Sequence, residues 1–116
     1  MKVVFFGDNL EEVELLDKYF QKYIAPKEGL VYKAKPCNGY DYKYENGDSY
    51  SIRLITFNSK GCRCNRVYYT NTIYKNDNLN EDKMYLVYSL LIPSENTRLN
   101  DCLIELKVED LEIDIK

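Results

Sequence analysis

The sequence contains no histidine and no tryptophan, although it has 12 tyrosines. Histidine is the commonest general base and the commonest metal ligand, so its absence removes the usual centre of acid–base and metal chemistry. The Gly-x-x-x-x-Gly-Lys-Ser/Thr phosphate loop is also missing from the chain. We therefore expect a protein that is not an enzyme and that binds neither a metal nor another cofactor.

Long apolar runs are absent too, and every run is far shorter than the roughly 20 residues that a transmembrane helix needs. Residues 3–6 are too few for the apolar region of a signal peptide, and Asp8 follows them at once. These observations predict a cytoplasmic protein without membrane contact. In that compartment the four cysteines are expected to be thiols.

The chain has 116 residues, of which 45% are hydrophobic and 30% are charged. This is the size and composition of one ordinary globular domain, so we predict a single domain over residues 1–116. The domain is large enough to bury a core without disulfides or metal.

Residues 8–26 carry the clearest helical pattern. Apolar side chains recur on one arc, which includes Val13, Leu16 and Phe20, and we predict that these three are core. Two capping pairs have the required spacing, Asp8 with Glu11 and Asn9 with Glu12. Pro26 is expected to end the helix, because it biases the preceding residue away from helical angles.

Several segments are predicted to be strands. Residues 2–6 are apolar on both faces and should lie inside a sheet, and residues 30–35 form a second strand. Residues 40–57 are predicted to form a hairpin with Asn46-Gly47 at its tip, and residues 62–75 a long strand. An odd hairpin loop with a bulge near Gly47 is preferred to a two-residue turn, because it keeps one face apolar and pairs opposite charges. It gives the pairs Tyr44–Tyr50, Tyr42–Ile52, Tyr40–Leu54 and Asp41–Arg53.

The end of the chain is predicted as a strand over residues 102–115, with a bulge at Glu109-Asp110 where the apolar phase changes. Residues 83–92 fit either a buried strand or a short helix. The resulting fold class is α+β, with one N-terminal amphipathic helix packed on a curved, mainly antiparallel sheet of about five or six strands.

Charge is unevenly distributed along the chain. Residues 30–75 hold eight lysines and arginines against three acids, a balance of +5, whereas residues 76–116 hold four against ten, a balance of −6. The total of −3 therefore conceals a basic middle and an acidic end. Two readings follow: the charges cancel locally in the folded sheet, or they form two poles that attract partners of opposite charge.

The densest chemical cluster lies in the basic middle. A glycine turn with three cations could hold phosphate, and nearby tyrosines could stack on bases. The alternative is a solvated turn and strand end. The candidate partner- or phosphate-binding residues are Lys60, Arg63, Arg66, Tyr68, Tyr69 and Tyr74. A zinc site of Cys37, Cys62, Cys64 and Cys102 is disfavoured, because Cys-x-Cys is not the usual spacing.

These features favour a small binding protein that neutralises or inhibits another macromolecule, most readily a protein partner. Tyrosine and arginine often anchor such interfaces. Phage-encoded inhibitors of host defence nucleases, such as anti-CRISPR proteins, and toxin immunity proteins share this size and acidity. The alternative function is a nucleotide- or RNA-binding domain that uses the basic, tyrosine-rich middle.

Self-association is a further expectation. One helix covers only one face of a sheet, yet residues 3–6 are apolar on both faces. If nothing else in the chain covers the second face, a two-fold homodimer would bury it.

Overall fold

A central sheet with helices on its faces organises the computed structural model, which describes residues 1–35, 39–55, 64–75 and 103–115. The sheet is six-stranded with the order β2-β3-β4-β1-β5-β6. Its strands are β1 (Lys2–Gly7), β2 (Leu30–Ala34), β3 (Gly39–Tyr44), β4 (Ser49–Leu54), β5 (Arg66–Thr70) and β6 (Leu103–Leu106). The helices are α1 (Leu10–Tyr19), η1 (Phe20–Ile24), α2 (Thr72–Lys75) and α5 (Val108–Ile115). The expected α+β class, with an N-terminal helix packed on a sheet, is confirmed.

The sheet is mixed. Among the described strands, the antiparallel pairs are β2–β3 and β3–β4, of which β3–β4 is the predicted hairpin. The pairs β1–β4, β1–β5 and β5–β6 are parallel. The sequence predicted a mainly antiparallel sheet, whereas the described sheet is mixed, because β1 lies between β4 and β5 and pairs with both in parallel.

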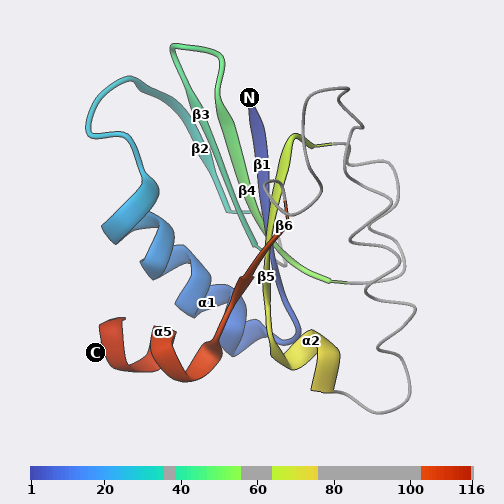
Figure 1. Cartoon of the computed structure of the whole chain (residues 1–116). Helices are drawn as coiled ribbons and strands as arrows, with labels where there is room; N and C mark the ends of the chain where they lie inside the picture. The colour runs from blue at the N-terminus through green and yellow to red at the C-terminus, as the bar shows by residue number, and fades with distance from the viewer. Residues whose placement is uncertain (36–38, 56–63, 76–102, 116) are drawn as a thin grey trace.

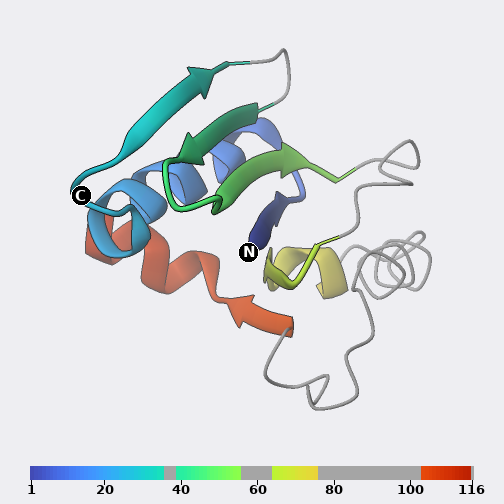
Figure 2. The same ribbon diagram turned by 90° about the horizontal axis from the view of Figure 1, so that it is seen from above.

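Strand β1 lies between β4 and β5, as its apolar character on both faces predicted. Val3 and Phe5 join the core beneath α1 and α5, while Val4 and Phe6 join a second core on the opposite face. Figures 1 and 2 show α1 and α5 side by side on one face of the sheet, with α2 away from them. Burial on both faces explains why this strand contains almost no polar residue.

Helix α1 begins with the second of the two predicted capping pairs. The Asn9 side chain accepts a hydrogen bond from the Glu12 amide at 2.9 Å, and Glu12 in turn accepts one from the Asn9 side-chain amide at 3.0 Å. The helix continues as a single π-type turn, η1, in which the Ala25 amide donates to the Phe20 carbonyl at 2.7 Å. Ala25 then has ψ 126°, so the helix ends at the residue before Pro26, as predicted.

The predicted core residues of this helix are confirmed, because Val13, Leu16 and Phe20 are all buried. The Phe20 ring lies against three aromatic rings of the sheet, with centroid distances of 5.9 Å to Phe5 and 4.9 Å to both Tyr42 and Tyr50. One amphipathic face therefore supplies much of the contact between helix and sheet.

The hairpin loop has the odd length that was predicted, but the strands pair two residues away from the expected register. Tyr42 lies opposite Tyr50, not Ile52, and Asp41 lies opposite Ser51. The apolar face is unaffected, because a shift of two residues preserves the side of every side chain. Gly47 adopts φ +91°, which permits the tight loop. Asp41 still forms an ion pair with Arg53 across the diagonal, at 2.6 Å.

Two predicted strands are too long. Within residues 64–75, the strand predicted over residues 62–75 ends with β5, because the chain turns into α2 after Thr70 and buries Ile73 against the second core. The strand predicted over residues 102–115 is limited to β6, and its supposed bulge is the start of helix α5. Leu111 is 3% exposed and Ile113 is 77% exposed, a helical rather than an inward-facing pattern.

Two further predictions concern residues 83–92 and the second face of strand β1. Residues 83–92, predicted as strand or helix, lie outside the described residues. The second face of β1, whose exposure was the reason for expecting a homodimer, is buried within one chain: Val4 is 2% and Phe6 1% exposed. The homodimer itself stays a prediction.

Candidate protein-binding edge

Strand β2 forms one edge of the described sheet, and none of its residues is buried. Leu30, Val31 and Tyr32 are 48%, 60% and 50% exposed. Figures 1 and 2 show this strand at the outside of the sheet, on the side away from α2. An exposed edge strand offers unpaired backbone N–H and C=O groups, so it can accept a further strand.

Lysine side chains flank this edge on both faces of the sheet. Lys33 lies over the Tyr42 ring, with 5.7 Å between the ammonium nitrogen and the ring centroid, and Lys35 lies over Tyr40 at 5.4 Å. On the opposite face Lys43 lies over Tyr32 at 5.3 Å. We call the set Leu30, Val31, Tyr32, Lys33, Lys35 and Lys43 the β2 edge surface.

Tyrosine–carboxylate hydrogen bonds fix the strand on which this surface rests. The Tyr40 hydroxyl donates to the Glu14 carboxylate of α1. Its oxygen lies 2.8 Å from Glu14 Oε1 and 2.7 Å from Glu14 Oε2. The Tyr42 hydroxyl donates to Asp17 at 2.6 Å and accepts from the Gln21 side-chain amide at 2.8 Å. These bonds tie β3, the strand that pairs with β2, to the helix.

The same contacts shift the ionisation of the paired groups. The hydrogen bond to Glu14, together with burial, raises the pKa of Tyr40 to about 12. Burial is the main cause that raises the pKa of Tyr42, followed by its hydrogen bond to Asp17. Burial also raises the pKa of Asp17 above its ordinary value. Both tyrosines are therefore neutral donors at physiological pH.

The residues predicted as a phosphate- or base-binding cluster are not brought together in the described part of the chain. Lys60 and Arg63 lie outside the described residues, as does the side chain of Tyr74. Tyr69 is buried in the second core, whereas Tyr68 faces the other side and stacks on Phe5 at 4.5 Å. Neither ring is free to stack on a base.

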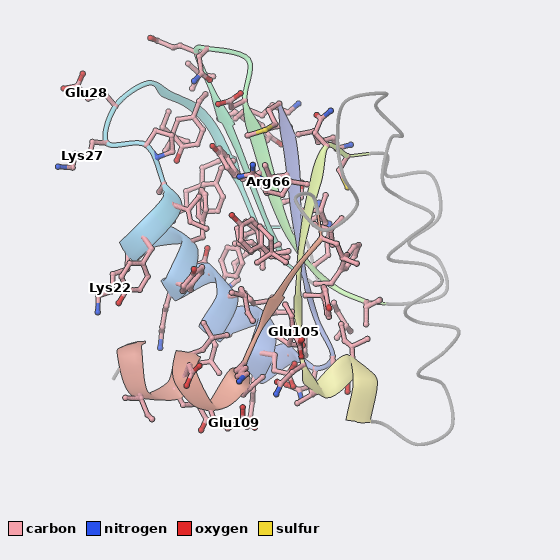
Figure 3. All side chains as sticks on the ribbon, in the orientation of Figure 1. Lys22, Lys27, Glu28, Arg66, Glu105 and Glu109 are labelled. Atoms are coloured by element: carbon pink, nitrogen blue, oxygen red, sulfur yellow. The ribbon has the colours of Figure 1, made fainter. Side chains whose placement is uncertain are left out.

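Arg66 is the described cation of that predicted cluster. It is half-buried at the start of β5 and shares a face with Tyr68, since side chains two apart in a strand point the same way. Figure 3 shows it over the sheet, whereas Lys27 and Glu28 point outward from the loop that precedes β2. Among the described residues, the β2 edge and not the region around Arg66 combines exposed apolar side chains with lysines.

A polar cluster missed by the sequence analysis lies where parallel strands β1 and β5 end. The buried Glu12 carboxylate accepts hydrogen bonds from the Thr72 hydroxyl at 2.6 Å and the Asp8 amide at 3.1 Å. Asn71 accepts a hydrogen bond from the Val108 amide at 3.1 Å, and so caps α5. These bonds join helix starts to strand ends, which gives the cluster a structural role.

The described residues contain no group of three or more His, Cys, Asp or Glu side chains placed to hold a metal ion. Of the four cysteines considered for zinc, Cys64 is described, and it is buried in the second core. None of the helices in the described ranges combines the length and the hydrophobicity that crossing a membrane requires.

Comparison with known proteins adds no relative. No protein-family model matches the chain, and neither a curated protein nor a solved structure matches it.

Proposed function

We propose that this protein is a small, non-enzymatic binding protein of the cytoplasm that neutralises or inhibits another macromolecule through the β2 edge surface. The observation that supports this most is the exposure of Leu30, Val31 and Tyr32 on an edge strand. Apolar side chains beside open backbone groups are what a protein partner can cover. The fitting classes are inhibitors of defence nucleases, including anti-CRISPR proteins, and toxin immunity proteins.

The test compares what different variants capture. Wild-type protein, a Val31→Glu variant and an Ile113→Glu variant would be immobilised and exposed to extract of the cells in which the protein occurs. Ile113 is the matched control, because it is an exposed apolar side chain on α5. We expect a macromolecule that is retained by wild type and by the control but is lost with Val31→Glu.

The captured macromolecule would then be assayed for its own activity with and without an equimolar amount of this protein. The proposal expects loss of that activity with wild type and not with Val31→Glu. Unchanged activity, or identical capture by all three proteins, would contradict an inhibitory role at the β2 edge.

Nucleotide or RNA binding is the alternative proposal. It is supported by exposed tyrosines that carry a lysine over the ring: Lys22 lies 5.1 Å from the Tyr23 centroid, and Lys43 lies over Tyr32. Aromatic rings with nearby cations suit unpaired bases. Binding of a labelled single-stranded RNA that weakens steeply with salt would favour this alternative, because phosphate contacts release counterions.

A homodimer is a separate proposal about assembly. Light scattering at micromolar concentration would give twice the 13.7 kDa of one chain if it forms. A mass of one chain that does not change on concentration would contradict the homodimer.

A further inference from the structure

We propose that the β2 edge surface accepts an acidic, extended segment of a partner protein as an added strand. This inference rests on the proposed function and specifies the chemistry of the partner. The segment would hydrogen-bond to the open backbone of β2 and would carry carboxylates at alternate positions.

The charges on β2 set that requirement. Between Leu30 and Lys35 every charged residue is a lysine. The ion pairs found in the described part of the chain join the N-terminal amine to Asp48 and Arg53 to Asp41, and none involves Lys33, Lys35 or Lys43. Glu14 and Asp17 of α1 accept hydrogen bonds from Tyr40 and Tyr42. Lys33 interacts electrostatically with Asp17 without forming an ion pair, so it and Lys35 can still contact an incoming carboxylate.

The spacing of the lysines sets the pattern of the partner. Lys33 pairs with Tyr42 in the sheet and shares its face, and Lys35 lies two residues further along the same face. Tyr32, paired with Lys43, points to the opposite face. An added strand also alternates its side chains. It would place acids at positions i and i+2 beside the two lysines, and apolar side chains on the face of Tyr32.

A second copy of this chain fits the edge less well. Two β2 strands side by side would place Lys33 and Lys35 of each copy along the same junction, and lysine on an edge strand is a common device against self-pairing. The pairing of β2 is also irregular between Leu30 and Tyr32, so each copy would present this bulge to the other. An acidic heterologous strand avoids the repulsion between lysines and brings no second bulge, although its backbone must follow the bulge of β2.

Short capped peptides provide the test, with amide chemical shifts of the intact protein as the readout. The probes are a Glu-Val repeat, a Lys-Val repeat, the Glu-Val repeat with alternate backbone nitrogens methylated, and a peptide with the sequence of residues 28–35. We expect the Glu-Val peptide to shift the amides of β2 and to bind about tenfold more tightly than the Lys-Val peptide. Methylation of the peptide's backbone nitrogens that face β2 should remove binding, because those nitrogens can no longer donate hydrogen bonds.

Charge reversal gives the matched control. The double variant Lys33→Glu, Lys35→Glu should exchange the preference, so that the Lys-Val peptide binds more tightly. Lys107→Glu, an exposed lysine beyond β6, should leave the wild-type preference intact. A preference that survives the double variant, or shifts confined to residues outside β2, would overturn the inference.

Two other results would also overturn it. Tighter binding of the peptide of residues 28–35 would identify a second copy as the occupant. Absence of any shift with the Glu-Val peptide at its solubility limit would exclude an acidic strand. Neither result decides the proposed function, since the capture experiment with Val31→Glu detects a partner of any charge or shape.

Discussion

Tyr42 shows how one side chain serves both the core and a buried polar contact. Its ring packs on Phe20, while its hydroxyl donates to Asp17 and accepts from Gln21. Removal of the hydroxyl would leave a partly buried carboxylate without this donor. We expect Tyr42→Phe to lower the free energy of unfolding by about 1–3 kcal/mol, measured by urea denaturation. Tyr32→Phe, at an exposed ring, is the control and should change stability little.

The tyrosine pKa values predict a loss of stability at alkaline pH. Tyr40 has a pKa of about 12 in the folded state, compared with 10.0 for an unperturbed tyrosine. The pKa values of Tyr42, Tyr44 and Tyr50 are raised as well. Because the folded state holds these protons more tightly, their contribution is complete below pH 10 and is lost as the pH rises toward 12.

Urea unfolding at a series of pH values measures this dependence. We expect the free energy of unfolding to fall between pH 10 and 12, and to fall less steeply in Tyr40→Phe, which lacks one of the titrating groups. A wild-type stability that stays level over that interval would show that the tyrosines are not perturbed as described.

At the scale of elements, α1 with η1 is the part most fully predictable from sequence. Its capping pair, apolar arc and terminating proline are local signals, and each acts within a few residues. We expect Phe20→Ala to cost roughly 3–5 kcal/mol of stability by urea denaturation, since the ring is fully buried. Tyr23→Ala, at a half-exposed ring on the same helix, should have a much smaller effect. Equal losses would mean that the helix packs on a different face.

Helix α5 was not predicted, and the reason is physical. The sequence from Val108 to Ile115 was interpreted as a strand whose apolar phase changes at a bulge. The same change of phase fits a helix, and Asn71, distant in sequence, supplies the cap at its start. A contact that depends on the folded topology cannot be read from a short window.

Leu111 and Ile113 separate the two interpretations of this segment. In a strand with the predicted bulge both side chains point inward, whereas in α5 only Leu111 is buried. We expect Leu111→Ala to lower stability by about 2–5 kcal/mol and Ile113→Ala to have little effect, both measured by urea denaturation. Similar losses for both variants would favour the strand.

The two described tyrosines of the predicted binding cluster, Tyr68 and Tyr69, lie on opposite faces of the sheet. Tyr68 and Tyr69 are adjacent in sequence, and a strand sends adjacent side chains to opposite faces. The alternation of side chains along a strand therefore predicts, from the sequence alone, that Tyr68 and Tyr69 point to opposite faces. The exposure of β2, by contrast, depends on the order of strands in the sheet, which the sequence does not indicate.

At the scale of the whole molecule, the described sheet has two unlike edges. At one edge β6 leads directly into α5, which packs beside α1 on the sheet. At the other edge β2 exposes apolar side chains flanked by lysines. The sequence predicted a protein partner from composition and charge, and the structure supplies the edge at which that proposal can be tested.

Hydrogen exchange of the protein, alone and in complex with its captured partner, tests this central claim most directly. We expect the amides of β2 to exchange at least about tenfold more slowly in the complex, because an added strand occupies them. The amides of β6, the opposite edge, should be unchanged. Protection at β6 or α5 with no change in β2 would contradict the account.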